Sequence, residues 1–171
     1  MDIYFVRHGA AVEQQEWKGS DRERPLTDAG ARQMTRAAEG LAALGVHPDR
    51  IISSPLVRAR QTADILAKEL RLTERPVADD RLAPGFGIEG LTAILETYSG
   101  SGSLVLVGHE PDFSTVIGRL IGGGRVECKK GSLARVQLKD AKGLTGVLLW
   151  LLPPKLLGGI ARDDRLPREA E

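Results

Sequence analysis

Three short apolar runs, each followed by polar residues and then by a helical pattern, constrain the fold of this chain most strongly. The runs cover residues 3–6, 50–53 and 103–107. Their β-branched and aromatic side chains favour extended structure, and a run that is apolar at consecutive positions suits a strand covered on both faces. Repeated strand–helix units favour a parallel sheet with right-handed crossovers. The sequence therefore predicts an α/β fold on a largely parallel sheet.

The ends of these runs carry four residues suited to an anion site. Arg7 and His8 end the first run, His109 follows the third, and Arg58 falls in the first turn of the helix expected after the second. Arg7 and His8 alone would equally fit a strand-end histidine capped by its neighbours. Because parallel strands share one carboxyl edge, all four side chains should converge. Two arginines and two histidines without a carboxylate cluster suit a tetrahedral oxyanion better than a metal ion, which predicts a phosphate site with no metal and no cofactor.

Helical periodicity and helix-capping residues predict helices in the segments between the runs. Thr27 is the expected N-cap of a helix that ends at Gly45. Ser54 is the expected N-cap of a second helix, with Pro55 at its first position. The other expected elements are helices at 91–98 and after residue 111, and hairpin strands at 133–138 and 144–152.

Length and charge restrict the class of protein. The 171 residues suit one domain, expected at residues 1–157, with a polar surface tail at residues 158–171. A net charge of +1 disfavours nucleic acid or an anionic membrane as partner. Cys128 is the single cysteine, so no internal disulfide or cysteine-rich metal cluster can form. The N-terminus begins directly with a strand and no apolar run reaches membrane-spanning length, which indicates a cytoplasmic chain.

Several other charged residues are better explained as surface. His47 lies beside a proline in an expected turn, and Arg60 is expected to be an exposed helix residue paired with Asp64 four positions on. Lys129 and Lys130 either edge the site or are simply exposed, and exposure is the preferred interpretation.

Five segments resemble motifs of one known family. Together they cover most of the chain: Val6-Arg7-His8-Gly9-Ala10-Ala11, Arg24-Pro25-Leu26-Thr27-Asp28-Ala29-Gly30, Ser53-Ser54-Pro55-Leu56-Val57-Arg58-Ala59-Arg60-Gln61-Thr62, Val107-Gly108-His109-Glu110-Pro111 and Gly131-Ser132-Leu133-Ala134-Arg135-Val136. In these segments the chain resembles the histidine phosphatase superfamily, and more closely its small phosphohistidine phosphatase branch, the SixA type.

The resemblance implies a fold, a reaction and a division of roles. The fold would be a three-layer α/β sandwich of the phosphoglycerate mutase type, with helices on both faces of the sheet. The reaction would be metal-independent phosphate hydrolysis through a covalent phosphohistidine on His8, with phosphate contacts from Arg7, Arg58 and His109. A histidine nucleophile presents one neutral ring nitrogen to phosphorus and needs a fixed acceptor for the other, for which a backbone carbonyl near Gly9 is the expected partner.

The proton donor is less well defined by the sequence. Larger members of the superfamily carry a carboxylate acid between the second and third motifs, where this chain has Asp79, Asp80 and Glu89. Glu89 is the most attractive by location, although a glutamate at a helix start is ordinarily a favourable partner of the helix dipole, and that interpretation is preferred. A missing acid would suit phosphohistidine, because a protonated phosphoimidazole releases a neutral imidazole without further help.

The expected substrate is a phosphohistidine-bearing protein. Residues 72–90, the longest segment free to cover the site, are too short for a cap domain, so a shallow and open site is expected. A small-molecule phosphomonoesterase of the same superfamily is one alternative. A catalytically silent module that binds phosphate or a phosphoprotein is the other.

Overall fold

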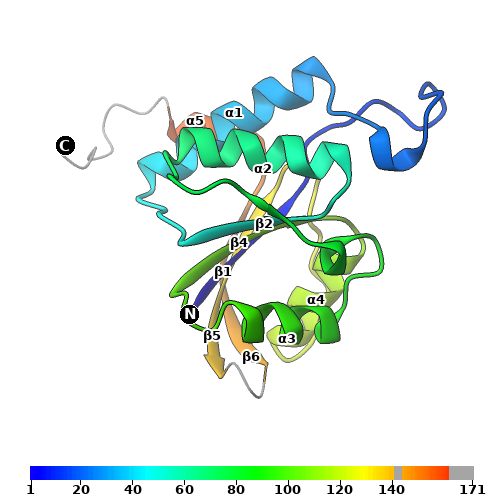
Figure 1. The fold of residues 1–171 in the computed structure, drawn as a ribbon. Coiled ribbons are helices and arrows are strands. Elements are labelled where there is room, and N and C mark those ends of the chain that lie inside the picture. The colour runs from blue at the N-terminus through cyan, green and yellow to red at the C-terminus, as the bar shows by residue number, and fades with distance from the viewer. Residues whose placement is uncertain (141–143, 162–171) are drawn as a thin grey trace.

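The computed structural model describes residues 1–140 and 144–161, and its centre is a six-stranded sheet (Figure 1). The spatial order of the strands is β3-β2-β4-β1-β5-β6. Their bounds are β1 Asp2–Arg7, β2 Arg50–Ser53, β3 Val77–Ala78, β4 Ser103–Gly108, β5 Leu133–Asp140 and β6 Thr145–Leu152. Strands β1 to β4 pair in parallel, while β5 pairs antiparallel with both β1 and β6. The expected mostly parallel sheet and late hairpin are confirmed; turn residues 141–143 lie outside the described residues.

Helices cover both faces of the sheet and make three layers (Figure 1). One face carries α1 (Asp28–Ala43), α2 (Val57–Glu69) and α5 (Pro154–Ile160), and the other carries α3 (Ile88–Thr97) and α4 (Asp112–Leu120). Short 3-10 turns, η1 (Asp21–Glu23) and η2 (Asp80–Leu82), precede α1 and α3. No helix in the described ranges is long and apolar enough to cross a bilayer.

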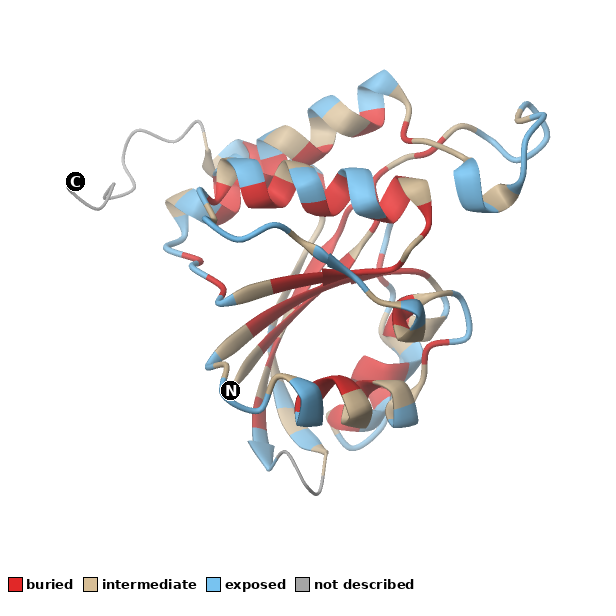
Figure 2. Cartoon of the chain, in the orientation of Figure 1, coloured by how far each residue is buried: buried red, intermediate tan, exposed pale blue. Residues whose placement is uncertain are grey.

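The apolar side chains divide into two cores, one on each face of the sheet. In β1, Ile3 and Phe5 join the core under α3 and α4, whereas Tyr4 and Val6 join the core under α1 and α2. This alternation follows from the two-residue period of a strand. Figure 2 shows the sheet and the inner faces of the helices as buried. The central strands are therefore apolar throughout, as the consecutive apolar runs predicted.

The helix starts agree with the sequence at α1 but not at α2. Thr27 caps α1 as expected, because its Oγ1 accepts a 2.9 Å hydrogen bond from the Gly30 N–H. Helix α2 begins at Val57 with Leu56 as N-cap, two residues later than the predicted cap at Ser54. The predicted cap was wrong: Ser54 Oγ accepts a 3.3 Å hydrogen bond from the Leu56 N–H just before the helix and also lies 2.8 Å from the Nε2 atom of His109.

The C-terminal part of the domain ends later than predicted. Helix α5 runs through Ile160, so the expected tail start at residue 158 falls inside a helix. The helix packs closely on α1, since a methyl group on Gly40 would lie 2.0 Å from the Leu157 carbonyl oxygen and one on Gly158 would lie 3.1 Å from Arg36 Cβ. Leu157 is fully buried and holds this turn on the domain. The rest of the predicted tail, residues 162–171, lies outside the described residues.

The contact between α1 and α5 generates a stability prediction. Gly40→Ala should lower the free energy of unfolding by about 1–3 kcal/mol, because the added methyl overlaps backbone that cannot move freely. Gly159→Ala is the matched control, since its methyl would meet no atom within 4 Å and alanine is the better helix former. Urea unfolding of both variants makes the comparison. Equal stability of Gly40→Ala and the parent would contradict the packing of α5 on α1.

Candidate active site

Neighbouring strands bring the two predicted histidines together. Arg7 of β1 lies opposite Gly108 of β4 in the parallel register, and the His8 N–H continues the ladder with a 3.1 Å bond to the Gly108 carbonyl. His8 and His109 therefore leave the sheet side by side, with ring centroids 5.1 Å apart. β2 pairs with β4 on the opposite side from β1, and α2 follows it with Arg58 in its first turn. The structure thus gathers all four predicted residues at one edge of the sheet.

The His8 ring is held in one orientation and one tautomer. Its Nδ1 lies 2.8 Å from the carbonyl oxygen of Gly9, the backbone acceptor expected from the sequence, and Nδ1 therefore carries the proton. Its Nε2 accepts a 3.2 Å hydrogen bond from Arg58 Nε. Thr62 fixes the loop from behind, since its Oγ1 accepts from the Gly9 N–H at 3.2 Å and donates to the Arg58 carbonyl at 2.8 Å. The unprotonated nitrogen of His8 consequently faces the arginine.

Asp21 anchors the guanidinium of Arg58. Arg58 Nη2 donates to Asp21 Oδ2 at 3.0 Å, and Nη1 donates to the Asp21 carbonyl at 2.8 Å. Arg24 Nε donates to the other carboxylate oxygen at 2.9 Å. Burial pushes the pKa of the Asp21 carboxyl upward, but the hydrogen bonds from Arg24 and Arg58 outweigh it and the pKa lies below its usual value. The segment between β1 and α1, in which the sequence singled out no site residue, therefore supplies one through Asp21.

Arg7 approaches the site from β1 with one donor unused. Its Nη1 donates to the Cys128 carbonyl at 2.9 Å, whereas its Nε is buried and has no acceptor among the described residues. Ser132, which accepts from the Arg7 N–H through its carbonyl at 3.2 Å, likewise has a buried Oγ without a partner in the described part of the chain. Arg7 and the residue directly before β5 thus each hold a buried polar group without a partner in the described chain, and such groups are uncommon in folded proteins.

Burial keeps both histidines neutral near pH 7. The pKa of His8 is lowered to about 3, chiefly by loss of hydration and also by the nearby His109, Arg58 and Arg7, against the opposing Gly9 hydrogen bond. Loss of hydration, together with Arg58, lowers the pKa of His109 to about 4. His8 and His109 are 7% and 4% exposed. His109 was predicted from the sequence, but its contact with Ser54, for which only a helix-cap role was expected, was not.

The carboxylates considered as proton donors lie in other contacts. Asp79 binds Arg81, with its Oδ2 2.6 Å from Nη2, and the hydrogen bonds from Arg81 hold the pKa of the Asp79 carboxyl below its usual value. Asp80 is exposed and lies 3.5 Å from Arg22. Glu89 is exposed in the first turn of α3 and lines a hollow that contains none of the four predicted site residues. A donor role for Glu89 stays a prediction.

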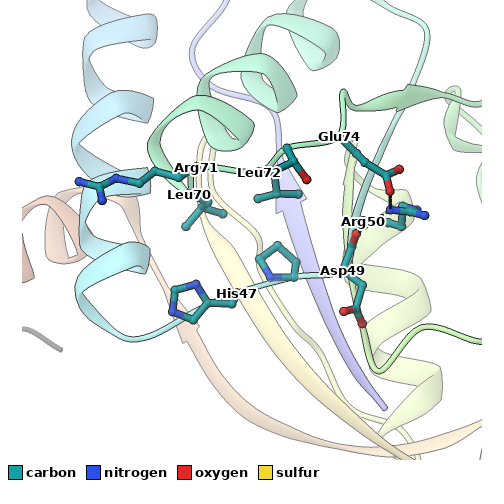
Figure 3. Close-up of a pocket in the computed structure, with 9 residues that line it drawn as sticks. His47, Asp49, Arg50, Leu70, Arg71, Leu72 and Glu74 are labelled. Atoms are coloured by element: carbon teal, nitrogen blue, oxygen red, sulfur yellow. Dashed lines mark hydrogen bonds and ion pairs between the residues drawn. The ribbon is translucent and has the colours of Figure 1, made fainter. Parts of the chain in front are cut away.

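The remaining candidates lie on the surface. His47 is exposed at the opposite edge of the sheet, where it borders a hollow of about 240 Å³ beside the Arg50–Glu74 ion pair (Figure 3). Lys129 and Lys130 are exposed, and Lys130 Nζ lies 3.1 Å from Glu13. Arg60 is exposed on α2.

Comparisons with known proteins point to one family. The family model of the histidine phosphatase superfamily (branch 1) matches residues 3–98. The phosphohistidine phosphatase SixA of Escherichia coli is 28% identical over 156 residues, which are 90% of this chain and 94% of SixA. An uncharacterized protein of Picosynechococcus is 41% identical over 114 residues, 66% of this chain and 68% of that protein. The structure of the protein histidine phosphatase SixA complexed with tungstate matches with a TM-score of 0.82 at 27% identity, covering 92% of this chain and 99% of that one.

The chain therefore belongs to the histidine phosphatase superfamily, and it is a phosphatase. Within that superfamily it is similar to the SixA type over nearly its whole described length, in agreement with the motifs.

The contact between Asp21 and Arg58 generates a prediction for catalysis. Asp21→Asn should lower kcat/KM for a chromogenic phosphate ester and weaken inhibition by inorganic phosphate, each by roughly ten-fold, because Arg58 loses its charged anchor. Glu23→Gln in the same 3-10 turn is the matched control and should keep the parent values. An Asp21→Asn variant that keeps parent-like kcat/KM would show that Arg58 needs no anchor.

The depressed histidine pKa values generate a prediction for stability. In the folded chain the pKa values of His8 and His109 are about 3 and about 4, against an ordinary value of 6.5. The folded chain therefore binds fewer protons than the unfolded chain once the pH falls below about 6.5. Stability should be full above that pH and decline below it, by up to about 1.4 kcal/mol per pH unit for each histidine. Urea unfolding between pH 7 and pH 5 measures the slope. His8→Asn should flatten it, and an unchanged slope would contradict a neutral His8.

Proposed function

We propose that this phosphatase works without a metal, through a covalent phosphohistidine on His8, and that its substrates are proteins that carry phosphohistidine. The observation that carries the proposal is the orientation of the His8 ring. With Nδ1 donating to Gly9, the lone pair of Nε2 is directed at the arginine donors that would hold a phosphate. A cytoplasmic location stays a prediction from the sequence.

The proposed first step is transfer of the phosphoryl group to His8. The Nε2 lone pair forms a bond to phosphorus while the bond from phosphorus to the substrate's imidazole nitrogen breaks. That nitrogen keeps the electron pair, and the imidazole leaves as a neutral ring because its other nitrogen is already protonated in the substrate. Nonbridging oxygens receive hydrogen bonds from Arg7, Arg58 and His109, which stabilise the charge in the transition state. The buried Arg7 Nε, without an acceptor in the described chain, supports this role.

The proposed second step is hydrolysis of the phosphoenzyme. Water attacks phosphorus, the bond to His8 Nε2 breaks, and inorganic phosphate is released with His8 restored. The hydrogen bond from Nδ1 to the Gly9 carbonyl keeps the ring in place and stabilises the positive charge that the ring carries while Nε2 is bonded to phosphorus.

The choice of phosphohistidine rests on similarity and on leaving-group chemistry. The relatives named SixA are a phosphohistidine phosphatase and a protein histidine phosphatase. The three carboxylates considered as acids are exposed or bonded elsewhere, which favours a substrate whose leaving group is a good one once protonated.

One observation favours a second candidate, a small-molecule phosphomonoesterase. Arg58, His8 and His109 are at most 7% exposed, and a small phosphate ester reaches recessed groups without a protein surface to accommodate. Substrate profiling separates the two candidates. Efficiencies are compared for a phosphohistidine-bearing domain, free phosphohistidine, phosphoserine, phosphotyrosine and sugar phosphates. A higher kcat/KM for a small ester than for the phosphohistidine domain would favour the phosphomonoesterase.

Loss of His8 tests the mechanism directly. His8→Ala should abolish turnover and the acid-labile ³²P adduct that the parent forms, because the nucleophile is gone. The free energy of unfolding at pH 7 should stay within about 1 kcal/mol of the parent. His47→Ala, at the opposite edge of the sheet, is the matched control and should retain both turnover and adduct. Near-normal turnover by His8→Ala would make the nucleophilic role untenable. Formation of the adduct by the parent would also exclude a silent binding module.

A further inference from the structure

Helices α1 and α5 border a basic hollow that the proposed reaction does not use. The hollow has a volume of about 500 Å³ and is lined by Arg32 and Arg36 of α1 and by Lys155 of α5. Its remaining lining consists of glycine, alanine, proline and glutamine, with no acidic side chain. The acidic residues of α1, Asp28 and Glu39, do not line it. Three cations therefore share one concave surface.

The charges of this hollow are not neutralised within the described protein. None of Arg32, Arg36 and Lys155 lies within 4.0 Å of a carboxylate of residues 1–140 or 144–161. All three are exposed. Elsewhere on the surface, cations such as Arg22 and Arg50 face carboxylates at 3.5 and 2.5 Å. A chain with a net charge of only +1 thus has a local excess of positive charge here.

The floor of the hollow is rigid. Gly158 of α5 packs against the base of the Arg36 side chain, where an added methyl would lie 3.1 Å from Cβ. One turn further along α1, Gly40 meets the Leu157 backbone. The two helices pack too closely at these contacts to slide past each other, so the backbone positions that carry the three cations keep a constant spacing.

One wall of the hollow is linked by direct contacts to the backbone of His8. Pro154 lines it, and a methyl on Gly131 would lie 3.2 Å from Pro154 Cγ. The N–H of Gly131 donates to the His8 carbonyl at 3.0 Å. A partner seated in the hollow would therefore lie next to the edge at which His8 emerges.

We propose that this hollow is a docking surface for carboxylates of the phosphoprotein substrate, an inference that rests on the proposed function. Arg32 and Arg36 are one helical turn apart and suit paired carboxylates, and Lys155 faces them from α5. Nucleic acid is the poorer occupant, because the lining has no aromatic side chain for stacking and the chain has no extended basic field. Exposed ion pairs are individually weak, so the surface acts by steering and orienting the substrate.

Charge reversal and matched peptides test the docking surface. Arg32→Glu/Lys155→Glu reverses the sign of the net charge of the lining and spares Arg36, whose Cβ packs on Gly158. Lys68→Glu/Arg75→Glu, also at exposed positions, changes the net charge equally and is the matched control. The probes are two phosphohistidine peptides that differ only in a flanking tract of four glutamates or four glutamines. Free phosphohistidine reports on the chemistry alone.

The parent and the control variant should hydrolyse the glutamate peptide with a kcat/KM roughly three- to ten-fold above that of the glutamine peptide, a preference that added salt reduces. The Arg32→Glu/Lys155→Glu variant should lose the preference and keep its rate on free phosphohistidine. Equal rates on both peptides by the parent, or an undiminished preference in that variant, would overturn the docking surface while leaving the proposed function intact. Turnover of small esters but of no phosphohistidine compound would overturn the proposed function, and the docking proposal with it.

Discussion

The parallel pairing of β1 with β4 is the constraint on which the site depends. Arg7 lies opposite Gly108 in this ladder, so the residues that follow, His8 and His109, leave the sheet as neighbours. A shift by one residue would turn either side chain toward the other face of the sheet. Because β4 lies between β1 and β2, it also fixes the start of α2 and with it Arg58. The site is therefore as rigid as the centre of the sheet.

Charge is balanced at this edge by two different means. Burial keeps His8 and His109 neutral, as their pKa values of about 3 and about 4 indicate. Arg58 cannot lose its charge, and with a side chain only 5% exposed it needs the carboxylate of Asp21 at 3.0 Å. Arg7 has no carboxylate partner among the described residues, and one of its donors is free. The edge thus retains the positive charge and the donor that a phosphate group requires.

The sequence predicted the features that depend on local patterns, and it did not predict the contacts between residues far apart in the chain. Consecutive apolar positions identified the strands, and the shared edge of parallel strands was enough to place His8, Arg58 and His109 together. Asp21 was missed because its partner is 37 positions away and nothing in a charged loop distinguishes it from a solvated residue. Ser54 was misassigned because a serine before a proline is an equally good helix cap. Helix α5 was missed since its Gly-Gly sequence has poor helix propensity, and its position depends on tertiary packing, in which Leu157 joins the core under α1.

The hydrogen bond from Arg58 Nε to His8 Nε2 bears on which electrophiles the resting enzyme can attack. A lone pair that already accepts a hydrogen bond is a poor nucleophile, and a neutral alkylating or acylating reagent offers the guanidinium nothing in exchange for it. An electrophile that carries anionic oxygens competes for the same N–H and so exposes the lone pair as it binds. In the proposed mechanism, the arginine that receives the phosphate therefore also shields the histidine from other reagents, and the charge of the substrate itself makes the histidine reactive.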